Sequence, residues 1–200
     1  MKNLQFLVLA VFLNLLSAQE KQIVETAKEF QNNLNVTFKN EEKSPLTVKD
    51  FRDFKSLNFF PISDKYIVKA TFVKAKNEKV FQMKTSTSRQ PEYIKYGELH
   101  FVLEGKECKL NLYQNLELIK KAGFEDYLFL PFSDQTCGKT SYIGGRYIDF
   151  KIPKTTTVTL DFNKAYNPYC AYNSKYSCPK IPLENDLEIE IKAGVKKFHE

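Results

Sequence analysis

The chain has 200 residues and a formal net charge of +6 at pH 7. Its 42% hydrophobic and 27% charged residues are typical of a globular protein, and they exclude a disordered or collagen-like chain. The positive excess is concentrated in residues 65–89, which hold seven basic side chains and one acidic. No aromatic–basic motif of a known nucleic-acid module accompanies it, so nucleic acid is not an expected partner. The segment is either an anion-facing patch or a set of edge strands that lysine protects from pairing.

Residues 1–18 have the form of a secretory signal peptide. Lys2 precedes an apolar core, and Ala18 is a small residue at a suitable cleavage point. The apolar core is too short to span a hydrocarbon layer, which needs about 20 residues. We therefore expect an exported protein, periplasmic or secreted after cleavage near Ala18, with no transmembrane anchor. The alternative is an uncleaved membrane anchor.

Next along the chain, apolar residues recur at helical spacing and predict an amphipathic helix over residues 21–35, at Ile23, Ala27, Phe30 and Leu34. A polar linker follows. Thr47 with Asp50 predicts the start of a second, short helix. We expect one side of that helix to be lined by Val48, Phe51 and Phe54.

From residue 66 the apolar period changes to two, which indicates strands. The predicted strands are 66–73, 80–85, 95–103, 108–113, 127–132, 146–152, 155–162 and 187–193. Residues 104–106 predict a hairpin turn, Pro131 is expected to stop its strand, and one helical turn is expected within 116–121. The fold class is therefore mainly β, a single-domain antiparallel β-sandwich or barrel-like sheet with one or two N-terminal helices. The expected divisions are a signal peptide (1–18), a helix and linker (19–46) and a β-rich domain (47–198).

Two segments that contain most of the glycines, prolines and cysteines of residues 131–185 resemble those of a known family. PFSDQTCGKTSYIGGRYID (131–149) resembles the proline-Phe-x-Asp-x-Thr-x-Gly block, ending in Gly-Gly-Arg-Tyr, of a bacterial family, the domain of unknown function 1684. LDFNKAYNPYCAYNSKYSCPKIPLEN (160–185) resembles its second signature, and the resemblance extends over about residues 50–198. Ile143 stands where the family usually has glycine, and Lys180-Ile181 replaces an apolar–proline step. The resemblance implies domain boundaries and candidate residues but no reaction.

Four cysteines are present. In an oxidising compartment Cys170 and Cys178 are expected to form a disulfide that closes a nine-residue loop; buried thiols or metal ligands are the alternatives. Cys108 is interpreted as a core residue. Cys137 has no histidine nearby in sequence, so a nucleophilic role is not expected.

Polar residues of the two segments are the candidate ligand-binding set: Asp134, Thr136, Lys139, Arg146, Asp149, Asp161, Asn163, Tyr166, Asn167, Glu184 and Asn185. A planar guanidinium suits a carboxylate or phosphate, so Arg146 binds either an anionic ligand or an internal partner, with Asp149 or Asp161 nearest in sequence. Some of these oxygens could also hold Ca²⁺, but the EF-hand spacing is absent, and no metal or cofactor is expected. The tyrosines of these segments either stack on a sugar or cap the core: Tyr147, Tyr166, Tyr169 and Tyr172.

The leading interpretation is an exported ligand-binding or interaction module with a polar cleft formed by residues 133–149 and 163–185. Its partner would be a small-molecule or envelope ligand. The alternative is a carboxylate-dependent hydrolase of an envelope or extracellular substrate, with Asp134, Asp161 or Glu184 as acid or base. A third interpretation makes both segments structural and places function on the basic face of residues 65–89. No catalytic residue is assigned, because only two histidines are present and neither has a partner in a known motif.

Overall fold

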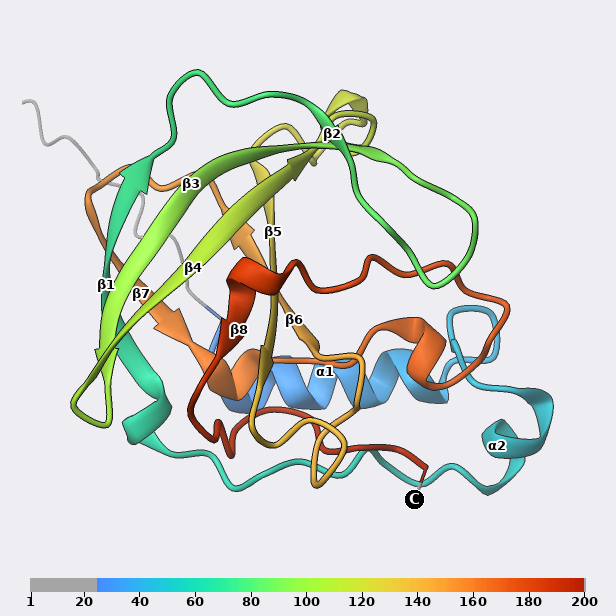
Figure 1. Cartoon of the computed structure of the whole chain (residues 1–200). Helices are drawn as coiled ribbons and strands as arrows, with labels where there is room; N and C mark the ends of the chain where they lie inside the picture. The colour runs from blue at the N-terminus through green and yellow to red at the C-terminus, as the bar shows by residue number, and fades with distance from the viewer. Residues whose placement is uncertain (1–24, 200) are drawn as a thin grey trace, which may run out of the picture.

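The structure is a computed structural model that describes residues 25–199 (Figure 1). The predicted signal peptide lies outside the described residues. Two α-helices, α1 (Ala27–Lys39) and α2 (Val48–Asp53), precede the sheet. The strands are β1 (Ile67–Lys74), β2 (Phe81–Gln82), β3 (Glu92–Leu103), β4 (Lys106–Asn115), β5 (Tyr127–Asp134), β6 (Arg146–Lys151), β7 (Thr157–Asp161) and β8 (Asp186–Leu187). Five 3₁₀ turns join them at Asp64–Tyr66, Leu118–Lys120, Phe162–Lys164, Tyr169–Ala171 and Leu183–Asn185.

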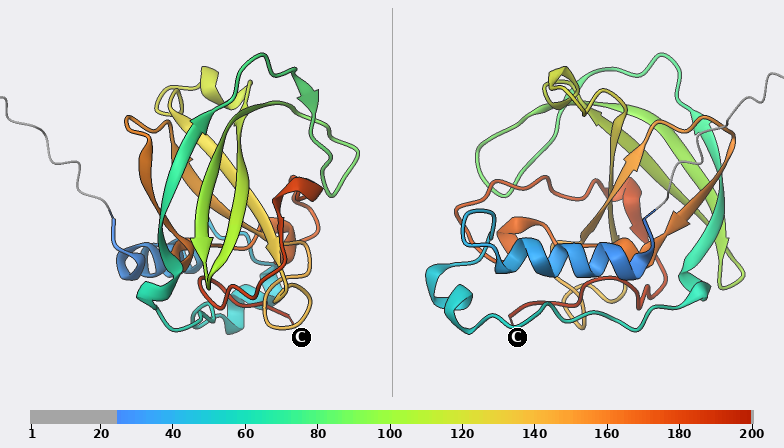
Figure 2. Two further views of the ribbon diagram at one scale, coloured as in Figure 1. Left: turned by 60° about the vertical axis from the view of Figure 1, so that its left-hand side comes forward. Right: turned by 180° about the vertical axis from the view of Figure 1, so that it is seen from behind.

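Helix α1 begins at a capping box that the sequence analysis did not identify. The Thr26 side chain accepts from the backbone N–H of Glu29 at 3.2 Å, and the Glu29 carboxylate accepts from the backbone N–H of Thr26 at 2.7 Å. The helix continues to Lys39, beyond the predicted end at residue 35. It lies across one end of the curled sheet, as the view from behind shows (Figure 2).

Helix α2 confirms the predicted start at Thr47, whose side chain accepts from the backbone N–H of Asp50 at 3.1 Å. Phe51 and Phe54 pack into a small cluster beside the sheet. Val48 does not join this cluster, since the residue is 74% exposed.

The eight strands form one curled sheet of order β6-β5-β4-β3-β1-β7, with β2 paired to β3 and β8 to β5. Pairing along the main path is antiparallel, and only β8 is parallel to its neighbour. The mainly β, barrel-like prediction is confirmed. The predicted hairpin between β3 and β4 is a two-residue turn, since Leu103 pairs with Lys106 and both Glu104 and Gly105 have positive φ.

Strand alternation creates two separate cores. On one face of β5 and β6, Leu128, Leu130, Phe132 and Ile148 join the main core. On the other face, side chains of the same strands join a second cluster formed by Met83, Tyr93, Tyr113, Phe129 and Tyr147. Strand β5 is therefore buried on both faces, which explains its continuous apolar run.

Two expectations about strands were wrong, and a third holds for one strand of two. Pro131 does not stop β5, which continues to Asp134 and pairs through Pro131 with Tyr147. In the basic segment, β1 is no edge strand, because it lies between β3 and β7, whereas β2 pairs with β3 alone among the described strands. The predicted strand 187–193 is a strand only at Leu187; its alternation instead reflects buried side chains at Ile189, Ile191 and Ala193.

Candidate functional site

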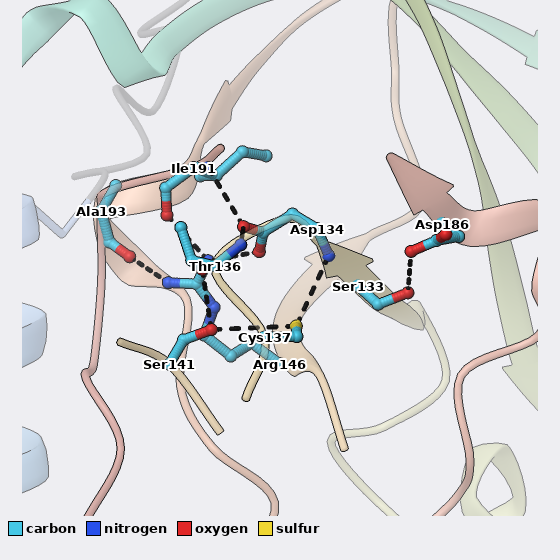
Figure 3. Close-up of polar contacts among 9 residues, drawn as sticks. All are labelled: Ser133, Asp134, Thr136, Cys137, Ser141, Arg146, Asp186, Ile191 and Ala193. Carbon is cyan, nitrogen blue, oxygen red and sulfur yellow. Dashed lines mark hydrogen bonds and ion pairs between the residues drawn. The ribbon is translucent and has the colours of Figure 1, made fainter. Parts of the chain in front are cut away.

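Arg146 has a completely buried side chain, which forms an ion pair with the equally buried Asp134 (Figure 3). Its Nη2 donates to Asp134 Oδ2 at 2.6 Å and to the backbone carbonyl of Ile191 at 2.8 Å. Its Nη1 donates to the carbonyl of Ala193, and Nη2 also lies 3.4 Å from Thr136 Oγ1. The guanidinium therefore ties β6 to the C-terminal segment.

Both carboxylate oxygens of Asp134 accept hydrogen bonds, whereas the buried Nε of Arg146 has no partner among the described residues. The Oδ1 of Asp134 accepts from the backbone N–H groups of Thr136 at 2.8 Å and Ile191 at 3.1 Å. The predicted internal partners of Arg146, Asp149 and Asp161, are thus replaced by Asp134. Because Arg146, Asp134 and Thr136 have almost no exposed surface, none of them is available to a ligand in this structure.

The buried amides among the candidates bind backbone. Asn163 accepts from the N–H of Ser63 at 3.1 Å and donates to its carbonyl at 3.0 Å, and it also donates to Asp161 Oδ1 at 2.8 Å. Asn185 bridges β4 and β5 by accepting from the N–H of Asn111 at 2.8 Å and donating to the carbonyl of Pro131 at 2.6 Å. These amides hold loops onto the sheet.

Three further candidate residues, Asn167, Lys139 and Glu184, form no hydrogen bond with the ion pair of Arg146 and Asp134 in the described structure. Asn167 is buried and donates to the carbonyl of Lys196 at 2.9 Å. Lys139 and Glu184 are exposed, and neither forms an ion pair within residues 25–199. The structure therefore does not bring Glu184 to Arg146.

A pocket of about 380 Å³ lies where β5 and β6 meet helix α1 and the 166–179 lobe. Six tyrosines and two phenylalanines dominate its lining. The lining residues are Phe30, Leu34, Tyr93, Leu118, Tyr127, Phe129, Tyr147, Asp149, Tyr166, Pro168, Tyr169, Tyr176, Ser177, Cys178 and Pro179. Both segments that carry the family resemblance contribute to this lining. Residues 131–149 supply Tyr147 and Asp149, and residues 160–185 supply seven lining residues between Tyr166 and Pro179.

Asp149 is the one charged residue in this lining. Its Oδ1 accepts from the hydroxyl of Tyr127 at 2.7 Å and from that of Tyr166 at 2.6 Å. Burial, and then the negative charge of Asp149, raise the pKa of both tyrosines well above the usual value, so their hydroxyls stay protonated and donate. Asp149 is exposed, and within residues 25–199 its Oδ2 forms no hydrogen bond and is an unused acceptor.

The aromatic walls meet at steep angles. Tyr147 lies edge-on to Phe129, at 4.6 Å between ring centroids and 76°, and to Tyr166, at 5.9 Å and 89°. Tyr169 and Tyr176 form another edge-to-face pair at 5.2 Å. Such pairs fix the rings in place, so the pocket is formed before any ligand arrives.

Of the eleven candidate residues, Asp149 and Tyr166 line the pocket. Alternation along β6 explains why Arg146 does not join them: it points to the main-core side, whereas Tyr147 and Asp149 point to the other. Among the tyrosines predicted either to stack on a sugar or to cap the core, Tyr172 lies in the core beside α2 and the other three line the pocket.

Sequence reasoning missed Tyr93, Tyr127 and Tyr176. A signal for Tyr127 was present, because an apolar run on both faces of a strand requires a second layer over the second face. No comparable signal identified Tyr93 or Tyr176, which reach the pocket from β3 and from the lobe.

Cys170 and Cys178 are adjacent thiols in the structure, and the predicted disulfide is not formed. The backbone N–H of Cys170 donates to Cys178 Sγ at 3.2 Å, and the hydroxyl of Tyr142 lies 3.9 Å from Cys170 Sγ. A hydrogen bond from the Cys178 thiol is the largest cause that lowers the pKa of Cys170, to about 6, with the hydroxyls of Tyr142 and Ser86 acting in the same direction. Cys170 and Cys178 line a second hollow of about 320 Å³, and Cys178 also lines the tyrosine pocket.

These features define a class of protein: a mainly β domain whose single curled sheet carries a preformed aromatic pocket on one face. The chain belongs to the family described as protein of unknown function (DUF1684), whose model matches residues 52–196. It is similar to an uncharacterised protein of Haloarcula marismortui whose structure was solved by NMR in solution. The two share 32% sequence identity with a TM-score of 0.67, over 84% of this chain and 91% of that one. No curated protein matches the sequence.

Two further observations concern residues 25–199 alone. No helix there combines the length and the apolar character that crossing a bilayer requires. No group of three or more His, Cys, Asp or Glu side chains in that range is arranged to hold a metal ion.

Proposed function

We propose that the protein is an exported module that binds a small molecule in the tyrosine pocket. The observation that carries this proposal is the pocket itself, about 380 Å³ in volume, with aromatic walls and one carboxylate. Ligand sites are typically concave, mostly apolar, largely preformed and equipped with few polar groups. The leader-like residues 1–18 support export.

The lining does not favour the hydrolase alternative. A hydrolase of the predicted kind needs two carboxylates around one open cleft. Among the described residues that line the pocket, Asp149 is the one carboxylate. Asp134 is buried against Arg146, and Glu184 lies outside the pocket.

The proposal includes oxidation of the adjacent thiols after export. Cys170 and Cys178 would each lose one proton and one electron to a thiol–disulfide oxidant, and the S–S bond would form between their sulfurs. A lowered pKa of Cys170 favours this step because the thiolate is the attacking species. Protein purified without reductant from an oxidising compartment should have a mass about 2 Da below the reduced chain and no alkylation at these residues. Alkylation of both thiols would contradict this part of the proposal.

Because the sequence contains no tryptophan, a single introduced tryptophan reports ligand binding through its fluorescence. Leu118→Trp places the one indole of the variant in the pocket lining, whereas Leu183→Trp places it at a residue that is 91% exposed and outside the pocket. Both variants are titrated against a library of small neutral, cationic and anionic molecules. A binder should change the emission of Leu118→Trp saturably and leave that of Leu183→Trp unchanged. If no molecule of any charge does so, and two-dimensional NMR of the unmodified protein shows no shifts at pocket residues, the proposed function is wrong.

A further inference from the structure

We propose that the ligand of the tyrosine pocket is a small organic cation, with its positively charged nitrogen seated against Asp149. The inference deepens the proposed function and depends on it. It follows from two features of the described residues: the charge of Asp149, which no ion pair neutralises, and the aromatic walls.

The charge of Asp149 is not neutralised by the protein. No Lys, Arg or His within residues 25–199 forms an ion pair with it. The hydroxyls of Tyr127 and Tyr166 orient the carboxylate through Oδ1, and Oδ2 remains without a hydrogen bond in the described structure. A carboxylate held in this way attracts a positive group and repels an anion.

The walls suit the same ligand. The face of an aromatic ring carries negative potential, and a cation within about 6 Å of a ring centroid is attracted to it. Six tyrosines line the pocket, and the edge-to-face pairs of Tyr147 with Phe129 and Tyr166 turn neighbouring rings in different directions. Cages of this composition are the usual recognition sites for ammonium groups that carry methyl substituents.

The hydroxyl groups of the lining are partly occupied. Those of Tyr127 and Tyr166 donate to Asp149, and that of Tyr147 donates to the carbonyl of Pro179. The Ser177 hydroxyl is hydrogen-bonded to Thr87 at 2.6 Å. The hydroxyls of Tyr169 and Tyr176 form no hydrogen bond within residues 25–199 and stay open to a ligand, so the preference for a cation depends on the charge of Asp149 and on the aromatic rings.

Two positive side chains lie near the rim and must be considered. Arg89 donates to the carbonyl of Ser177 at 3.0 Å, and the Lys175 ammonium lies 5.1 Å from the centroid of Tyr176. Both residues are exposed and neither lines the pocket. Water and salt screen all three of these charges, because Asp149 is exposed too. Asp149 differs from the other two in lying directly in the lining, so a ligand in the pocket contacts its charge and not theirs.

The test compares a cation with its neutral carbon isostere. Choline and 3,3-dimethylbutan-1-ol have nearly the same shape and differ in the charge of the quaternary centre. Binding of each to the full protein is followed by two-dimensional NMR and by the emission of Leu118→Trp. We expect choline to bind at least about tenfold more tightly than the alcohol, a ratio equivalent to about 1.4 kcal/mol, with shifts at pocket residues.

Asp149→Asn supplies the matched variant, because its amide oxygen can still accept from Tyr127 and Tyr166. It should lose about tenfold or more in choline affinity with little change for the alcohol, whereas Glu184→Gln, an exposed carboxylate outside the pocket, should change neither. Equal binding of choline and the alcohol, or an unchanged choline affinity in Asp149→Asn, would overturn the cation inference and leave the binding function intact. Failure of both probes and of every library member would overturn the binding function as well.

Discussion

Removal of the Arg146 guanidinium distinguishes a structural role for this residue from a role in binding. Arg146→Met keeps an unbranched apolar chain and deletes every donor. Asp134 would then keep its two backbone donors, from Thr136 and Ile191, but would be a buried carboxylate without a counter-charge. The carbonyls of Ile191 and Ala193 would lose their donor too.

Breaking a buried ion pair on one side costs about 3–5 kcal/mol, because the remaining charge is uncompensated. Since domains of this size are stable by about 5–15 kcal/mol, Arg146→Met should remove a large part of the free energy of unfolding. Asp134→Asn combined with Arg146→Met should be more stable than Arg146→Met alone, because the double variant leaves no buried charge. Exposed Arg52 is the control, and Arg52→Met should change the free energy of unfolding by less than about 0.5 kcal/mol.

Urea unfolding followed by circular dichroism measures these differences. A cost below about 1 kcal/mol for Arg146→Met would refute the reasoning, as would a double variant no more stable than the single one. If Arg146 instead bound an anionic ligand, its loss would abolish binding and leave the free energy of unfolding unchanged.

Two further predictions concern one turn and one surface carboxylate. Gly145 has φ +81°, and a Cβ there would lie 2.5 Å from a side-chain carbon of Ile181; Gly145→Ala should therefore cost about 1–3 kcal/mol in urea unfolding, and Gly105→Ala, with φ +77° but open space around it, should cost less. A hydrogen bond from the Lys95 ammonium is the main cause that lowers the pKa of Glu98 from 4.5 to about 2. Because the folded-state pKa is the lower one, this contribution to stability is present above about pH 4.5 and is lost as the pH falls toward 2. Glu98→Gln should flatten that part of the pH–stability curve, and an unchanged curve would contradict the prediction.

Features encoded by adjacent residues were predictable from the sequence. The hairpin at Glu104 and Gly105 was indicated by a glycine, which tolerates positive φ, between two runs of alternating apolar residues, and α2 depends on a Thr47 side chain that reaches the N–H three residues later. Each requires no knowledge of the rest of the chain. Strands β1 to β7 each overlap a predicted strand for the same reason, since the apolar pattern of a strand is a property of a short window.

Features that depend on distant partners were not predictable in the same way. The alternation of residues 187–193 indicated a strand, but these residues pack their apolar side chains into the main core while Ile191 and Ala193 offer backbone carbonyls to Arg146. A buried guanidinium satisfies such carbonyls as well as a neighbouring strand would satisfy them. The sequence contains no sign of which of these two solutions is used.

Strand geometry alone excludes one of the two internal partners that were expected for Arg146. Once β6 is accepted as a strand, residues 146 and 149 lie on opposite faces, so Asp149 is excluded as a partner by alternation alone. The pocket walls are a harder case, because Tyr93 and Tyr176 come from a strand and a lobe whose relative placement is decided only by the complete fold.

Strand β6 therefore connects the buried ion pair of Arg146 and Asp134 to the tyrosine pocket. Its first residue, Arg146, is held by Asp134 and by the C-terminal segment, and this interaction fixes the register and the facing of the strand. A slip of one residue would turn Asp149 away from the pocket and bring Ile148 into its place. The buried ion pair thus affects binding only by holding β6 in the position that places Asp149 in the pocket. Variants of Arg146 should lose ligand affinity only in proportion to the loss of folded protein. Variants of Asp149 should lose affinity while the protein remains folded.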